Sequence, residues 1–329
     1  MREGTVFVSP MAGESSRFRK VGFERPKFML PAFGKTIFEF AIGSFAAYFQ
    51  SSPFILITNN NQAAVEFVKN QVAALGITSV KYVAMDRQTA GQAETVALGL
   101  EACSITTDEP IAIFNIDSFR LNFSAPERAD IRNADGYLEV FKGMGAHWSF
   151  AKVSGSDSFR VTETAEKQRI SDLCSNGFYY FQKAAEFLAA FEADRAEGTV
   201  GEYYIAPLYN RLITKGDDIR AYLIPESDTE FCGLPTEYRD FLLSGVARAW
   251  DITHIEVDPE ALNPASFKAA LSADDLPKAM AILRAIGFGH PLTTEHLDLA
   301  VSLLGTLGRN DDAAAIKTMA DYTRLENMT

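Results

Sequence analysis

Apolar positions in the first half of the chain form short continuous runs that alternate with longer segments of helical spacing. The short runs are rich in β-branched and aromatic residues: TVFVSP (5–10), FILIT (54–58), VKYVAM (80–85) and IAIFNID (111–117). Between them, residues 36–49, 61–75 and 92–104 carry apolar residues three and four positions apart. Strands that alternate with helices predict βαβ units and a parallel sheet with helices on both faces.

From about residue 148 the pattern changes. Further strand-like runs follow, now with fewer helices between them: WSFAKV, FRVTE, FYYFQ and IRAYLIP. Helical spacing is confined to about 183–195 and 203–215. We interpret this part as a continuation of the same sheet, so the fold class is α/β with a mixed, mostly parallel sheet flanked by helices.

A change of composition at PEALNP (259–264) marks a domain boundary. After it the chain is rich in Ala and Leu and predicts helices at about 275–287, 294–307 and 311–325. Asp274 or Asp275 can cap the first helix, Thr293 or Thr294 the second, and Gly308 follows the end of the second. We therefore predict a domain at 1–258 and a small all-α domain at 259–329, which serves packing or the assembly of several copies of the chain.

The composition restricts the partners. The 329 residues carry a formal net charge of −12. Nucleic acids and anionic membranes are bound by basic faces, so this charge argues against both. No apolar stretch approaches the roughly 20 residues of a membrane span, and the first residues do not form a signal peptide.

The cysteines and histidines give no sign of a disulfide framework or a zinc site. Cys103, Cys174 and Cys232 are far apart, without a CxxC pair, which is typical of reduced thiols in a cytoplasmic protein. The four histidines lack ligand spacing. We expect a cytoplasmic protein.

The segment PMAGESSRFRKVGFERPKFMLP, from Pro10 to Pro31, holds the candidate chemistry. The small residues Ala12 and Gly13 follow the first strand, which lets backbone N–H groups point into one concavity. Five basic residues follow within eleven positions and only Glu24 opposes them: Arg17, Arg19, Lys20, Arg25 and Lys27. Such a local excess of positive charge indicates a site for anionic groups, although a solvated loop is the alternative. The loop is neither a Walker A motif nor GxGxxG.

Asp117 ends the strand-like run IAIFNID, with Asn115 two residues before it. A carboxylate there could hold Mg²⁺ against phosphate oxygens. The alternative is an aspartate that caps the next turn.

Together these segments resemble the sugar-phosphate nucleotidylyltransferase (nucleotide-sugar pyrophosphorylase) family, in particular the branch associated with bacterial capsular and surface polysaccharides. The resemblance covers about residues 5–243. Its segments, in order, are PMAGESSRF, RPKFMLPAFGKTIFEF, TAGQAETVAL, NIDSF, WSFAKV, AEKQRISD, SNGFYYF, GEYYIAPLYNRLITKG and GLPTEYRDFL. It implies a Rossmann-like fold of the nucleotide-diphospho-sugar transferase type.

The resemblance also implies a reaction and a role for each residue. A nucleoside triphosphate is joined to a sugar 1-phosphate, or a similar phosphomonoester, with release of pyrophosphate and with Mg²⁺ as cofactor. The triphosphate cradle would consist of Ala12, Gly13, Glu14, Ser15, Ser16 and Arg17, and Arg17 would hold the leaving pyrophosphate. Lys27 would neutralise the transition-state phosphate and Asp117 would bind Mg²⁺. Gln88 and Gly91 would read the base, Lys167 would bind the acceptor phosphate, and Glu166 and Gly177 would line the acceptor pocket.

The chain departs from the family pattern at three places. Ser15 replaces a glycine of the loop, beside Glu14; we expect this serine to occupy a position with negative φ. The stretch TEFCGLP has Phe231 and Cys232 where the family often has a second metal carboxylate, leaving Glu230 or Asp228 as substitutes. Phe28 stands where many relatives have proline.

Two other functions stay open. A non-catalytic nucleotide or nucleotide-sugar binder that acts through its helical tail would explain the altered loop and the missing second acid. A glycosyltransferase of similar sheet architecture would normally show an Asp-x-Asp metal pair, whereas this chain has Asn115-x-Asp117. The nucleotide, which could be CTP, UTP or dTTP, is not specified by the sequence.

Overall fold

The computed structural model describes most of the chain. The described residues are 1–121, 123–155, 159–198, 201–250, 263–273, 275, 278–279, 281–282 and 294–326. They form two compact units, each built from two stretches of sequence: Met1–Gly13 with Ala41–Glu230, and Glu14–Phe40 with Phe231–Thr329. The predicted boundary between residues 258 and 259 lies outside the described residues and stays a prediction.

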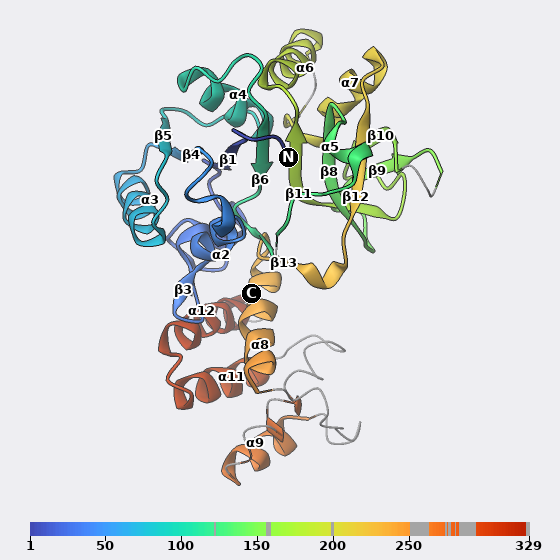
Figure 1. The fold of residues 1–329 in the computed structure, drawn as a ribbon. Coiled ribbons are helices and arrows are strands. Elements are labelled where there is room, and N and C mark those ends of the chain that lie inside the picture. The colour runs from blue at the N-terminus through green and yellow to red at the C-terminus, as the bar shows by residue number, and fades with distance from the viewer. Residues whose placement is uncertain are drawn as a thin grey trace. The chain divides into compact units, whose positions relative to one another are not determined.

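The first unit contains a nine-stranded mixed sheet (Figure 1). Its strands are β1 (Val6–Met11), β4 (Phe54–Asn59), β5 (Val80–Met85), β6 (Ile111–Phe114), β8 (Gly136–Lys142), β9 (Ser149–Val153), β10 (Val161–Glu166), β11 (Leu173–Phe181) and β12 (Ile219–Leu223). The order is β10-β9-β11-β6-β1-β4-β5, and β8 pairs with β11 and β12. The early strands β6, β1, β4 and β5 run parallel, whereas β11 is antiparallel to β6, β8 and β9. The predicted fold class is confirmed.

The helices of the first unit mostly fall in the predicted segments, but the short helix over 129–132 was not predicted, and the segments 36–49 and 203–215 are each divided between a helix and a 3-10 turn. These helices are α2 (Ile37–Gly43), α3 (Gln62–Leu75), α4 (Gln92–Ala102), α5 (Ala129–Arg132), α6 (Ala184–Glu197) and α7 (Tyr209–Lys215), with 3-10 turns η2 (Ala46–Tyr48), η3 (Ala206–Leu208) and η4 (Glu226–Asp228). Asn61 caps α3 by accepting a hydrogen bond from Ala64 N at 3.1 Å, and Gly76 ends it in the left-handed conformation.

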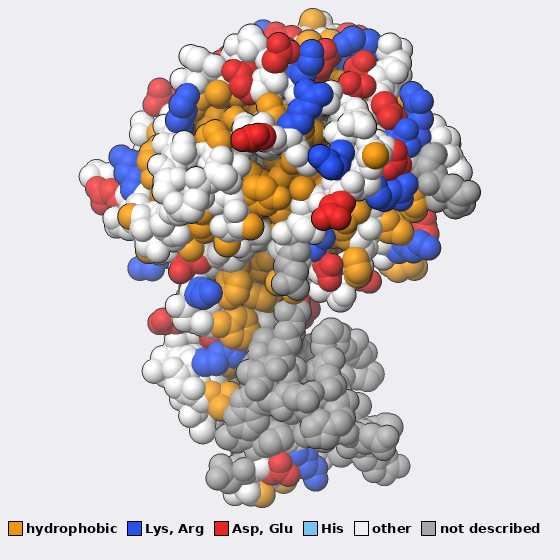
Figure 2. Space-filling model, in the orientation of Figure 1, with side chains coloured by type: hydrophobic (Ala, Val, Ile, Leu, Met, Phe, Trp, Pro, Cys, Tyr) orange, Lys and Arg blue, Asp and Glu red, His pale blue; other side chains and the backbone are white. Residues whose placement is uncertain are grey.

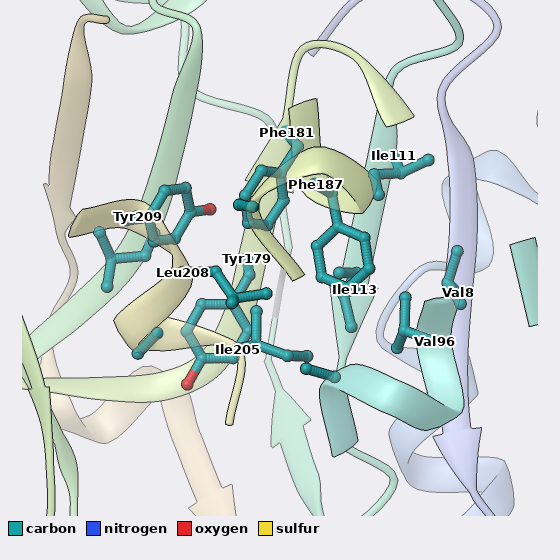
Figure 3. Close-up of a cluster of buried hydrophobic side chains, with 14 of the residues drawn as sticks. Val8, Val96, Ile111, Ile113, Tyr179, Phe181, Phe187, Ile205, Leu208 and Tyr209 are labelled. Carbon is teal, nitrogen blue, oxygen red and sulfur yellow. The ribbon is translucent and has the colours of Figure 1, made fainter. Parts of the chain in front are cut away.

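Alternation along each central strand sends side chains to two different cores. Val6 and Val8 of β1 face α4, α6 and α7, in a cluster with Ile113 and Phe181 (Figure 3). In that cluster the rings of Phe181 and Tyr209 stack at 4.5 Å. The Tyr209 hydroxyl lies 2.9 Å from the carbonyl oxygens of Tyr137 and Tyr180, so α7 is tied to two strands.

The other face of the sheet is aromatic. Phe7, between the two valines, packs against Phe45 and Phe54, with ring centroids 4.8 and 5.0 Å apart. Phe45 also meets Phe114 of β6 edge-on at 5.0 Å. On the outside of this unit, acidic and basic side chains are interspersed over the face in view in Figure 2.

The described residues of the second unit form helices and one small hairpin. Its elements are α1 (Ser16–Lys20), η1 (Lys27–Met29), the hairpin β2 (Pro31–Ala32) with β3 (Lys35–Thr36), α8 (Pro235–Trp250), α9 (Pro264–Ser272), α11 (Thr294–Thr306) and α12 (Asn310–Glu326). The predicted helices at 294–307 and 311–325 are confirmed. Gly308, with φ +72°, follows α11 as expected. Asp275 accepts a hydrogen bond from Lys278 N at 3.2 Å, as a cap would.

Several predictions of local structure need correction or fall outside the described residues. β8 and α8 were not predicted, and the strand predicted over 111–117 ends at Phe114. Most of the helix predicted over 275–287, with Asp274, and the alternative cap Thr293 lie outside the described residues. The three cysteines are buried free thiols. Within the described part of the chain, every helix is too short or too polar to cross a membrane.

Candidate functional site

The basic loop begins where β1 ends, and its most unusual residue is Ser15. Its backbone has φ 54° and ψ 37°, which is the left-handed conformation. The expectation of a negative φ was therefore wrong. A non-glycine residue in this region costs roughly 1 kcal/mol or more because its Cβ approaches the following carbonyl. Ser15 thus retains a backbone conformation that suits glycine.

Hydrogen bonds of the loop compensate for that strain. The Ser15 hydroxyl oxygen accepts a hydrogen bond from the backbone N–H of Lys27 at 3.0 Å. Arg19 Nε donates to the carbonyl oxygen of Glu14 at 2.9 Å. A serine at this position therefore does something that glycine cannot, because its side chain fixes the backbone of the lysine twelve residues later.

Aromatic packing anchors the same loop, while its basic side chains lie at or near the surface. Phe18 is buried between Phe23 and Tyr238, with ring centroids about 6 Å away. Arg17, one position earlier, is exposed, and Lys27 is half-buried. The loop consequently presents positive charge from a fixed backbone, which suits an anionic ligand.

In the first unit, the loop before α4 is fixed by a close backbone approach. A Cβ on Gly91 would lie 2.4 Å from the carbonyl oxygen of Tyr203, so glycine is required there. Ala93 N donates to that same oxygen at 3.0 Å. Glu94 accepts from the N–H of Ala90, and the hydrogen bond from Arg87 lowers the pKa of Glu94. Exposed Gln88 lies in this loop.

Three segments meet just after β6. Gln92 of α4 donates from Nε2 to Oδ1 of Asn115, and Asn115 N donates to the Gly177 carbonyl oxygen at 3.2 Å. Gly177 has φ +91°, and a Cβ there would lie 2.4 Å from Asn115 Nδ2. Asp117, half-buried, lies in the turn between β6 and β7 (Ser118–Arg120).

A buried charged network that was not predicted lies beside this turn. Glu139 of β8, fully buried, accepts from Arg120 Nε at 2.9 Å and from Asn176 Nδ2 at 2.8 Å. Burial raises the pKa of Glu139 although Arg120 opposes the shift. Arg120 Nη1 also donates to Asp228 Oδ2 at 3.3 Å. The network thus connects Arg120 of β7, the strand after Asp117, with Asn176, the residue before Gly177. In the sequence it was indicated by the acidic residue inside the apolar run GYLEVFK.

The predicted acceptor residues lie at the end of β10. Glu166 accepts a hydrogen bond from Ser149 Oγ, and burial raises the pKa of Glu166. The Tyr179 hydroxyl donates to Ser149 Oγ at 3.2 Å, and burial raises the pKa of Tyr179 to about 12.

Lys167 is a second non-glycine residue in the left-handed conformation, with φ 54°. Its backbone N donates to the Trp148 carbonyl oxygen at 2.9 Å. Its ammonium donates to the Tyr204 hydroxyl at 2.5 Å and lies 4.4 Å from the centre of that ring. Burial acts to lower the pKa of Lys167, but the hydrogen bond to Tyr204 and the nearby charges of Glu166 and Glu202 together outweigh it, and the pKa is raised.

One short segment connects these parts of the first unit. Tyr203 contacts Gly91 through its backbone, while Tyr204 contacts Lys167 through its hydroxyl. This segment therefore links two of the predicted site residues, Gly91 and Lys167. Glu14, Ser15, Ser16, Arg17 and Lys27 belong to the second unit.

Among the described residues, no three or more His, Cys, Asp or Glu side chains gather in a way that could hold a metal ion. Of the two proposed substitutes for the second acid, Asp228 forms the ion pair with Arg120, and Glu230 is half-buried. Mg²⁺ is commonly held by one or two carboxylates together with substrate phosphates and water, and Asp117 fits that arrangement.

Comparison with solved structures places these features in a family. A nucleoside-diphosphate-sugar pyrophosphorylase from Vibrio cholerae RC9 is 46% identical, with a TM-score of 0.68, over 72% of this chain and 99% of that chain. A UDP-glucose pyrophosphorylase complexed with UDP-glucose is 16% identical, with a TM-score of 0.58, over 75% and 99%. The inositol-1-phosphate CTP transferase from T. maritima is 13% identical, with a TM-score of 0.57, over 72% and 93%.

The two distant similarities show the fold alone. No family model matches the sequence, and no curated protein matches it. The similarity to the Vibrio cholerae protein is of a different kind, because nearly half of the aligned residues are identical and almost all of that chain is covered. The chain belongs to the nucleoside-diphosphate-sugar pyrophosphorylase family.

Proposed function

We propose that the protein is a nucleotidylyltransferase that joins a nucleoside triphosphate to a sugar 1-phosphate, or a similar phosphomonoester, and releases pyrophosphate. The observation that carries the proposal is the loop from Glu14 to Lys27. In it a serine keeps the left-handed backbone that suits glycine and bonds to the backbone of Lys27. The loop thereby presents Arg17 and Lys27 from a fixed backbone, which suits an anionic ligand.

The reaction requires positioning and charge neutralisation. A phosphate oxygen of the acceptor attacks the α-phosphorus in line and forms a new P–O bond. The bond from the α-phosphorus to the bridging oxygen breaks, and its electron pair leaves with pyrophosphate. Negative charge therefore accumulates on the α-phosphoryl oxygens and on the leaving group, where fixed cations and N–H donors lower the barrier.

Each residue has a task in this scheme. The backbone of residues 12–17 cradles the triphosphate, Arg17 binds the pyrophosphate, and Lys27 neutralises the transition-state charge. Gln88 and Gly91 contact the base. Lys167 binds the acceptor phosphate, and Glu166, as a carboxylate, accepts hydrogen bonds from acceptor hydroxyls beside Gly177.

Asp117 would hold Mg²⁺, with phosphate oxygens and water completing the shell. The ion would supply charge neutralisation at the phosphates. Within this proposal the enzyme works in the cytoplasm and its product serves surface-polysaccharide synthesis, with CTP as eligible a substrate as UTP or dTTP.

The test is pyrophosphate release with Mg²⁺, using CTP, UTP, dTTP, GTP and ATP against a panel of sugar 1-phosphates and other phosphomonoesters. Turnover with one pair, lost in Asp117→Ala without loss of the folded state, is the expected result. No pyrophosphate release with any pair, together with nucleotide binding in calorimetry, would instead favour a non-catalytic binder. The lack of a carboxylate at Cys232 is consistent with that alternative.

A further inference from the structure

The turn of the β2–β3 hairpin, four residues after η1 of the basic loop, has a strained backbone. Phe33 and Gly34 form the two-residue turn, with φ 52° and 74°. Two positive φ values in such a turn favour Asn-Gly, and a bulky residue there is an outlier. Strain of this kind persists only where the surroundings hold the backbone in place.

Helix α12 supplies those surroundings. The Asp312 side chain, which is 2% exposed, accepts the Phe33 N–H with both carboxylate oxygens at 3.2 Å. Arg309 forms an ion pair with Asp312 at 2.6 Å and places its guanidinium carbon 4.0 Å from the centre of the Phe33 ring. Phe241 of α8 meets the same ring edge-on at 5.2 Å.

Helix α8 holds the same hairpin at a second point. The Tyr238 hydroxyl donates to the Pro31 carbonyl oxygen, and the Tyr238 ring packs against Phe18 and Phe23. On the α12 side, a Cβ at Gly22 would lie 3.2 Å from Thr318 Cγ2. The C-terminal helices therefore contact the chain both before and after Lys27.

Between those contacts the chain is short and internally bonded. Leu30 N donates to the Lys27 carbonyl oxygen at 3.1 Å, and Pro31 follows directly. At the other end, Ser15 holds the Lys27 N–H. A displacement of Pro31 or Phe33 would therefore be transmitted to the backbone of Lys27.

We infer that the C-terminal helices fix the conformation of the basic loop, with Asp312 and Tyr238 acting as positioning residues for the backbone of Lys27. This inference rests on the proposed function, because the role of Lys27 comes from it. It assigns the helical tail a task within the chain itself.

The first test compares Asp312→Ala with Asp311→Ala. Both residues lie in the first turn of α12, but Asp311 is exposed, so the pair is matched for its effect on the helix dipole. We expect Asp312→Ala to lower kcat about tenfold or more while the acceptor KM changes less than about twofold, because misplacement of about 1 Å can cost far more than that. Asp311→Ala should retain the wild-type kcat.

A second readout does not depend on activity. Amide hydrogen exchange over residues 27–36 should accelerate in Asp312→Ala and stay unchanged in Asp311→Ala. If the wild-type chain releases no pyrophosphate, the proposed function fails, and the exchange measurement still decides whether α12 holds this segment.

Tyr238→Phe covers the case in which Asp312→Ala does not fold. It keeps the aromatic ring and removes only the hydroxyl that bonds to Pro31. A lower kcat with faster exchange at residues 27–36 supports the inference. Wild-type kcat and wild-type exchange in Tyr238→Phe overturn it, as would equal losses in Asp311→Ala and Asp312→Ala.

Discussion

Ser15 and Lys167 share the same strained backbone, with φ 54° in both, yet each supports a cation in a different way. At Ser15 the side chain bonds the backbone of Lys27. At Lys167 the backbone is held by Trp148, and the ammonium itself bonds to Tyr204. In the first case the structure fixes the backbone of a lysine, and in the second it fixes the ammonium group at the end of a lysine side chain. Under the proposed function, the acceptor phosphate would compete with or join Tyr204 at Lys167.

The largest expected effects separate the two lysines kinetically. Lys27→Ala should lower kcat by about 10²–10³, because a preorganised cation at the developing charge is lost. Lys167→Ala should chiefly raise the acceptor KM, since its ammonium contacts the acceptor phosphate in the ground state as well. Steady-state pyrophosphate release measures both, with Lys20→Ala as a control for the loss of one exposed cation. An identical kinetic defect in both variants would erase the distinction.

The next largest effect is on stability, and it depends on how closely other atoms approach Gly177 and Gly13. Gly177 has positive φ and no room for a Cβ, whereas a Cβ on Gly13 meets nothing within 4 Å. We expect Gly177→Ala to lower the free energy of unfolding by about 2 kcal/mol or more, through strain and overpacking. Gly13→Ala should change it by less than about 0.5 kcal/mol. Urea unfolding of both variants tests this, and equal stabilities would contradict the close approach.

A pH profile sharpens the description of the acceptor end. Ser149 donates to Glu166 and so favours its ionised form, while burial already raises the pKa of Glu166. Removing the donor in Ser149→Ala should raise this pKa further, so the acid limb of kcat/KM for the acceptor should move to higher pH. Ser149→Thr, which keeps a hydroxyl, should leave the limb in place. An unmoved limb in Ser149→Ala would mean that the Glu166 carboxylate does not control it.

The smallest effects separate strain from hydrogen bonding at Ser15. Ser15→Ala keeps the strained Cβ and loses the bond to Lys27, which should cost about 1 kcal/mol of stability and about threefold in kcat. Ser15→Gly loses the same bond but relieves the strain, so its stability should stay within about 0.5 kcal/mol of wild type. Denaturant unfolding and kcat together test the pair. A lower free energy of unfolding for Ser15→Gly than for Ser15→Ala would contradict the backbone strain at Ser15.

The sequence predicted the parts of the molecule that depend on local pattern. The parallel strands and helices α3 and α4 follow directly from periodicity, and Gly308 ends α11 as expected. β8 was missed because Glu139 interrupts its apolar pattern, and that carboxylate is tolerated only through Arg120 and Asn176, which come from distant strands. The φ of Ser15 could not be predicted either, because the bond that supports it reaches a residue twelve positions away.

The candidate site was predicted as a set of residues but not as an arrangement. The family pattern supplied Gly91 and Gly177, and the structure gives the reason for both in the backbone and side chains that approach them. The contacts of Tyr204 with Lys167 and of Asp312 with Phe33 join residues 37 and 279 positions apart. Such contacts leave no trace in local spacing.

The second unit joins Glu14–Phe40 to Phe231–Thr329, and this has a consequence for biosynthesis. The basic loop leaves the ribosome early, but α12, which holds Phe33, is completed only about 290 residues later. At about 5–20 residues per second, the loop waits on the order of 15–60 s for it. A truncated nascent chain would carry every predicted ligand-binding residue and still lack the helices that hold Phe33, so premature nucleotide binding on the ribosome should be weak.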